Sequence, residues 1–347
     1  MTGGLLPALL LLLAPLSGEV RARVTTGPEA DSNARRDISG EAPRADLLWR
    51  SQLWGLLAHQ EAGQRVGVEA QLGAKLFQHQ RTEDLLVSEL RARHETRLLS
   101  LLGTFAEVSA RDRRQRSGLR TYSTASAEAG LVLGPVWALQ FVVGGGPRGF
   151  IFWPDNRFHH AGASLSGSAL LRFTDAELAS ASTGLDGRVF PQGYPAVGED
   201  EQGQRTFDKS DRRRDGSAWG ELSVESVRAL YLRAALRVSG NVSNSRGEAY
   251  ARARLGLTAG LSLPGGVRLL ADTQLQATRW PEGLGLGERL ALQESDENQT
   301  SASVQVSVPL AGGLWLEGRT AAYTAELSAV RTPFLRFTAL LALGYRL

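Results

Sequence analysis

The chain has 347 residues, of which 42% are hydrophobic, and its formal net charge at pH 7 is only +3. So small a net charge argues against a dedicated nucleic-acid binder. No cysteine occurs, which excludes disulfides, lipoprotein acylation and thiolate metal sites. After the N-terminus, no apolar run approaches the ~20 residues that a membrane-spanning helix needs.

The N-terminus is typical of an export signal. The apolar run at residues 5–16 contains two prolines and is too short to span a membrane as a helix. We therefore predict a signal peptide over residues 1–22, cleaved after Ala22 or after Gly18, with a short membrane anchor as the alternative. Residues 23–43 combine charge, glycine and proline without periodicity, which predicts a disordered tail on the periplasmic side.

Alternating apolar and polar residues, the pattern of a strand, begin clearly at residues 65–78, where Arg65, Glu69 and Lys75 share the polar face. Residues 83–110 fit either two strands or one helix, because the spacing is helix-like and strong helix formers are present. Further strands are predicted near residues 118–133, 136–152, 160–173, 218–225 and 227–238.

Two hairpins dominate the C-terminal third. Residues 249–263 and 267–277 alternate apolar and polar side chains on either side of a Pro-Gly-Gly turn. Residues 300–310 and 314–325 repeat the pattern around an Ala-Gly-Gly turn. Tight turns therefore alternate with longer polar connections.

Two long polar connections are predicted to be surface loops. The longer covers residues 174–217 and the other residues 279–299, and both carry charges. Counting strands back from the C-terminus places both loops at the same end of the sheet.

Residues 334–347 show the cleanest alternation, because every odd position from Leu335 to Leu347 is apolar. Here the chain resembles the closing strand of a bacterial outer-membrane β-barrel. The resemblance implies a C-terminal assembly signal formed by Tyr345 and Leu347, although Leu347 replaces the usual terminal phenylalanine. It also implies the barrel-assembly machinery, outer-membrane lipid and lipopolysaccharide as partners, and the outer membrane as location.

We therefore predict an all-β fold, a transmembrane antiparallel up-and-down β-barrel over residues 44–347. Two strands in residues 83–110 give about 14 strands, and a helix there gives about 12. A soluble β-sandwich or barrel is the alternative. It is disfavoured because many apolar faces consist of small residues, which fill a soluble core poorly.

The charged residues on the predicted inner faces are the candidate functional set. Charges of both signs would form ion pairs that brace the wall, whereas a local positive excess would select anions. The lumen-lining candidates are Arg233, Arg237, Glu248, Arg252, Arg254, Arg268 and Asp272.

The favoured function is a channel or transport conduit for small hydrophilic or anionic solutes, or for an exported polymer. One alternative is an outer-membrane lipid hydrolase, for which His160, Ser164 and Ser166 are the one neighbourhood with suitable residues. These share the polar parity and lack the spacing that such enzymes show, so no catalytic residue is predicted. A structural or adhesion barrel acting through its loops is the other alternative. No cofactor or metal is predicted, and the sequence is silent on oligomeric state.

Overall fold

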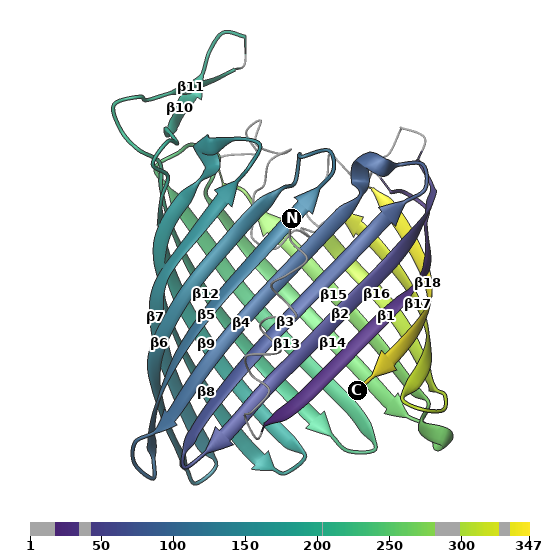
Figure 1. Cartoon of the computed structure of the whole chain (residues 1–347). Coiled ribbons are helices and arrows are strands. Elements are labelled where there is room, and N and C mark those ends of the chain that lie inside the picture. Colours follow the sequence, from purple (N-terminus) through teal and green to yellow (C-terminus); the bar gives the residue numbers. More distant parts are fainter. Residues whose placement is uncertain (1–17, 35–42, 203, 282–298, 326–333) are drawn as a thin grey trace.

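A closed antiparallel barrel forms the body of the protein in the computed structural model, which describes residues 18–34, 43–202, 204–281, 299–325 and 334–347 (Figure 1). In these ranges the barrel has 16 strands, so the predicted number of 12 to 14 is wrong. Every strand pairs with its neighbour in the chain, except that β9 pairs with β12 and the first strand closes on the last.

The strand bounds follow the chain order. The barrel strands are β1 (Glu19–Asp31), β2 (Asp46–Glu61), β3 (Gln64–Phe77), β4 (Leu85–Arg97), β5 (Leu102–Gln115), β6 (Tyr122–Val136), β7 (Leu139–Phe152), β8 (His160–Thr174), β9 (Glu177–Val189), β12 (Arg214–Val227), β13 (Leu230–Ser243), β14 (Tyr250–Ser262), β15 (Arg268–Arg279), β16 (Gln299–Pro309), β17 (Leu314–Ala325) and β18 (Leu335–Arg346). The remaining elements are the hairpin strands β10 (Ala196–Glu199) and β11 (Arg205–Phe207) and the 3-10 turns η1 (Arg81–Glu83), η2 (Asn156–Phe158) and η3 (Pro264–Gly266). No helix in the described ranges is long and apolar enough to cross a membrane.

The two ends of the barrel differ in their connections. At the turn end, drawn at the bottom of Figure 1, neighbouring strands are joined by tight turns such as residues 62–63 and 175–176. At the loop end, drawn at the top, the connections are longer, and the β10–β11 hairpin projects beyond the barrel rim. The connection between β15 and β16 leaves from this same end, as predicted, although residues 282–298 lie outside the described ranges.

The outer surface is apolar because each strand sends alternate side chains to opposite faces. Outward-facing Leu257, Phe337 and Leu341 are 44%, 52% and 55% exposed, although all three are large and apolar. Such a belt of exposed hydrophobic side chains is what a barrel presents to lipid. Tyr345 belongs to this face, and the backbone N–H of Leu347 donates to the carbonyl of Ala22 on β1.

Strand β1 is the first correction to the sequence prediction. Residues 23–31 were predicted to begin a disordered tail, yet they form most of the strand that joins β2 to β18. Residues 19–22, assigned to the signal peptide, begin the same strand, whereas residues 1–17 and 35–42 lie outside the described ranges. The charges that suggested disorder face the lumen, where partner strands neutralise them.

Strand β9 is the second correction. Residues 177–189 lie within the predicted long loop 174–217, but they pair with β8 and β12 along their whole length. Small residues hide the pattern, and Gly184 is required because an added Cβ would lie 2.5 Å from Nε1 of Trp219 on β12. The connection from Phe190 to Arg213 is the part that leaves the barrel.

The ambiguity at residues 83–110 is resolved in favour of strands. Strands β4 and β5 pair from Leu85 with Gln115 to Arg97 with Gly103. Helix propensity is overridden here because an unpaired edge would expose backbone groups that lipid cannot satisfy.

The assignment of side chains to the lipid face or the lumen face can be tested at adjacent positions of β14. Arg in place of outward-facing Leu257 should impair assembly, because an arginine on the lipid face near the bilayer midplane costs about 2–4 kcal/mol. Arg in place of Thr258 points into the lumen towards Asp272 and should be tolerated. The measurement is the heat-dependent shift in migration on SDS gels, which a folded barrel shows. Equal loss of the shift in both variants would refute the assigned faces.

Candidate functional site

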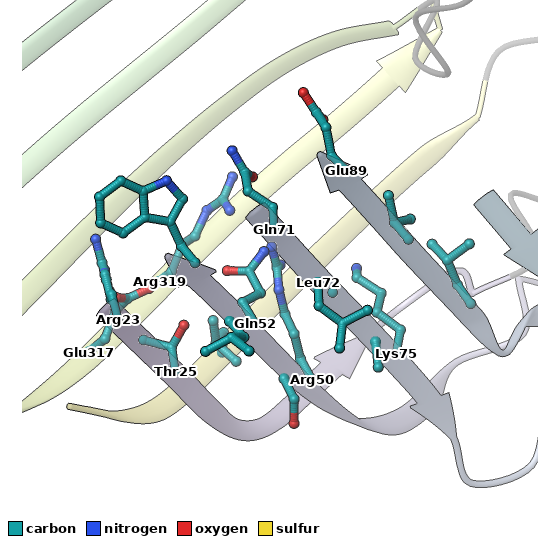
Figure 2. A pocket seen from close by; sticks show the side chains of 18 of the residues that line it. Arg23, Thr25, Arg50, Gln52, Gln71, Leu72, Lys75, Glu89, Glu317 and Arg319 are labelled. Atoms are coloured by element: carbon teal, nitrogen blue, oxygen red, sulfur yellow. The ribbon is translucent and has the colours of Figure 1, made fainter. Parts of the chain in front are cut away.

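A cavity of about 1550 Å³ occupies the lumen against the wall formed by β1–β5 and β14–β18. Figure 2 shows Arg23, Arg50, Lys75 and Arg319 on the strands around it. A second cavity of about 590 Å³ continues towards the turn end and shares Arg23, Leu270, Gln305 and Arg346 with the first. The lumen wall is therefore hollowed over a continuous stretch rather than at one isolated pocket.

Positive charge dominates the lining of the large cavity. Among the described residues that line it, nine are Arg or Lys and two are Glu. The basic residues are Arg21, Arg23, Arg50, Lys75, Arg111, Arg113, Arg254, Arg319 and Arg346, and the acidic residues are Glu89 and Glu317. An excess of this size creates a positive local potential although the whole chain is nearly neutral.

Glu29 organises two of these cations. Its carboxylate accepts a hydrogen bond from Arg50 Nη1 at 3.0 Å and another from Lys75 Nζ at 2.9 Å. The Glu29 side chain is 1% exposed, whereas Arg50 and Lys75 remain 18% and 24% exposed. The negative charge is thus hidden in the wall, and two positive charges share it at the cavity surface.

Further ion pairs bind β1 to its surroundings. Arg23 Nη2 lies 3.1 Å from Glu317 Oε2 on β17. At the loop end, Arg336 of β18 donates from Nε to both carboxylate oxygens of Asp31, at 2.9 and 3.0 Å, and both side chains are buried. Together with Glu29, these contacts connect β1 to β2, β3, β17 and β18.

Three of the predicted lumen residues lie in or beside the two cavities. Arg254 lines the large cavity and donates to Gln276 Oε1 at 2.8 and 3.0 Å. Arg268 lines the smaller cavity nearer the turn end. Asp272 accepts a hydrogen bond from Thr258 at 2.9 Å.

The other predicted residues on β13 and β14 lie elsewhere on the wall. Arg252 is 7% exposed, and its Nε donates to Thr278 Oγ1. Arg237 lies 3.6 Å from Glu221 and Arg233 precedes it on β13, both outside the lining of the large cavity. The structure therefore does not bring the predicted cluster together as one site.

Glu248 fixes the base of the projecting hairpin and does not line the large cavity. It accepts hydrogen bonds from Arg205 and Arg213 at 3.0 and 3.1 Å, and Arg213 also pairs with Asp215 at 2.7 Å. Burial alone would lower the pKa of Arg213, but the hydrogen bonds and charges of Asp215 and Glu248 raise it above the ordinary value. Arg213 thus stays charged at the point where the hairpin meets the barrel.

His160 lies in an aromatic stack inside the lumen. A lipid hydrolase would need this residue on the lipid-facing side of the barrel. The His160 ring is buried between Phe150 and Phe190, with centroid distances of 4.9 and 5.0 Å. Ser166 donates instead to Glu128 Oε1 at 3.0 Å. Stacking in the lumen explains this histidine structurally.

Sequence reasoning missed most of the cations in the large cavity. Lys75 was assigned to a polar strand face, but Arg23 fell in the predicted tail and Arg111 directly after the ambiguous region 83–110, in a stretch with no assigned strand. Arg319 lay in the predicted strand 314–325 without a predicted partner. These residues come from distant parts of the chain, and only the strand register brings them together.

Comparison with solved structures supports the fold. The chain resembles OprB of Pseudomonas putida with a TM-score of 0.54 and 10% identity, covering 98% of this chain and 97% of that one. It resembles CdiB of Acinetobacter baumannii with a TM-score of 0.51 and 8% identity, covering 94% and 60%. A third similar structure is the outer-membrane protein OmpT of Vibrio cholerae in its trimer form, at 0.45 and 10%, covering 95% and 99%.

No protein-family model matches the sequence, and no curated protein sequence matches it. At identities near 10% the structural similarities show the fold alone. The chain has the porin-like fold of outer-membrane β-barrels.

The role of Glu29 can be separated from that of the neighbouring carboxylate on β1. Glu29→Gln should increase anion preference, because Arg50 and Lys75 lose the charge that they share. It should also destabilise the barrel by about 3–5 kcal/mol, the cost of breaking a buried ion pair. Reversal potential in a planar bilayer reports the preference, and urea unfolding reports the stability.

Asp31→Asn is the matched control for Glu29→Gln. It breaks the ion pair with Arg336, in which the carboxylate is as buried as that of Glu29 and neither side chain lines the large cavity. Stability should fall in a similar way while anion preference stays unchanged. An identical change of reversal potential in both variants would contradict the local role of Glu29.

Proposed function

We propose that the chain is exported by its N-terminal signal, is inserted in the outer membrane with the loop end at the cell surface, and forms a channel that favours small anions. One observation carries the proposal: nine Arg or Lys side chains and two Glu side chains line the large cavity. A cavity of one charge sign, walled by low-dielectric material, concentrates counter-ions and raises their flux.

The position of the cations supports passage rather than bracing alone. Arg50 and Lys75 share one carboxylate, and Arg319 has no ion pair among the residues that the structure describes. Arg346 lines both cavities, so positive side chains extend from the middle of the barrel towards the turn end. An entering anion would meet successive cations along the wall.

The two alternative functions receive less support. A lipid hydrolase needs a nucleophile and a base within hydrogen-bond reach near the lipid, whereas His160 is stacked inside the lumen. An adhesion role would use the β10–β11 hairpin, where Val197 and Phe207 are 59% and 43% exposed. Those two side chains alone do not define a partner.

Removal of single cations from the wall tests the channel. Arg319→Ser and Arg254→Ser should each lower the ratio of chloride to potassium permeability by roughly twofold to fivefold, since one charge at short range in high dielectric is worth ~0.5–1 kcal/mol. The reversal potential under a potassium chloride gradient measures this ratio.

Arg114→Ser serves as the control for these variants. It removes the same charge from the outer face, where Arg114 stacks on Trp153. Its reversal potential should equal that of the unaltered protein. A folded barrel that shows no conductance, or a cation preference, would refute the proposal.

A further inference from the structure

Apolar side chains interrupt the charged lining of the large cavity on β4. Leu85 and Val87 line it there, and the strands on either side carry cations. Lys75 on β3 is the register partner of Leu85, and Arg113 on β5 is the register partner of Val87. Side chains that are directly opposite in an antiparallel pair have Cβ atoms ~4.5–5.5 Å apart. Leu85 therefore has a cation beside it on β3, and Val87 has one beside it on β5.

Gly73 leaves open space beside this apolar pair. It is the register partner of Val87 on the β3 side, and a Cβ added to it would meet no heavy atom within 4 Å. Arg50 pairs in register with Lys75 one strand further on. The wall here has an apolar floor, a notch at Gly73 and cations at its edges.

Apolar surface in a water-filled lumen is not needed for conducting simple ions. Chloride or phosphate would require the cations alone, and polar side chains at positions 85 and 87 would serve them equally well. Hydrocarbon, in contrast, gains by leaving water for such a surface, and a few charged groups then orient the ligand. The side chains thus match a solute with a hydrocarbon body and one anionic end.

We propose that Leu85, Val87 and Gly73, with Arg50, Lys75 and Arg113 at the edge, form a recognition site for amphipathic monocarboxylates. The proposal rests on the proposed anion channel and adds the substrate class. The carboxylate binds at the cations, and the hydrocarbon body lies on Leu85 and Val87 above Gly73. A polyhydroxylated carboxylate can use the cations but gains nothing from the apolar floor.

Block of chloride current in planar bilayers tests this class. Hexanoate and gluconate carry the same charge on carbon skeletons of equal length and differ in hydroxylation. With the unaltered protein, hexanoate should block at a concentration about tenfold lower than gluconate does, the scale expected for burial of a methylene or more in an apolar pocket. Equal block by the two carboxylates would overturn the proposal.

Two variants test whether the preference for hexanoate over gluconate arises at this site. Val87→Ser removes part of the apolar floor, and Gly73→Val fills the notch with a residue suited to strands. Each should reduce the ratio of the two blocking concentrations to roughly one, because Val87→Ser removes apolar contact and Gly73→Val fills the space in which the hydrocarbon body would lie. Val142→Ser on β7, outside the lining of the cavity, should keep the tenfold ratio.

The outcomes separate this inference from the proposed function. If both site variants keep the ratio of the unaltered protein, the site is refuted whatever the ion preference is. If the unaltered protein prefers chloride but hexanoate and gluconate block its current at equal concentrations, the proposed anion channel stands and the proposed substrate class is refuted. If it shows no chloride preference in a potassium chloride gradient, the proposed function itself fails. The heat-dependent gel shift checks that each variant is folded.

Discussion

Pairing of the first strand with the last is the constraint on which the rest of the structure depends. In lipid, unpaired backbone groups at a sheet edge have no solvent to satisfy them, so a barrel must close. Here β1 closes it, although Pro28 has no N–H to donate. Gly27 is required beside it, because an added Cβ would lie 2.0 Å from the carbonyl oxygen of Leu341 on β18. Ion pairs on the lumen side compensate for this imperfect ladder.

The ion pairs that hold the seam, the junction at which β1 pairs with β18, also determine the charge of the lumen. Glu29 is buried in the wall, so the cations that bind it present their remaining hydrogen-bond donors to the cavity. Arg23 likewise both pairs with Glu317 and lines the cavity. Stability and selectivity therefore draw on the same side chains, and a substitution on β1 is expected to change both. Residues such as Arg254, which is held by the amide oxygen of Gln276, contribute charge without bracing the seam.

Alternation predicted the membrane fold and the outward faces, because lipid permits few exceptions along a strand. The lumen accepts polar, charged and small apolar side chains alike. The charged side chains that face it in residues 23–31 therefore led to the prediction of a disordered tail. Glycines required by tight packing weakened the pattern in β9, as at Gly184 beside Trp219. Arg254 was predicted to line the lumen, and it lines the large cavity. The cations on β1–β5 that line the same cavity could not be found from sequence spacing. Their proximity depends on a register that closes the barrel across the whole chain.

A disulfide across the seam tests the closure by β1 most directly. Thr26 and Leu343 are register partners on β1 and β18, and the absence of native cysteine makes the double variant Thr26→Cys, Leu343→Cys free of competing pairs. Directly paired strand positions meet the Cα separation that a disulfide needs. On oxidation of the membrane-embedded protein, we expect nearly complete cross-linking and retention of the compact form after boiling until reductant is added. Absence of this cross-link, with free thiols in a folded barrel, would contradict closure by the first strand.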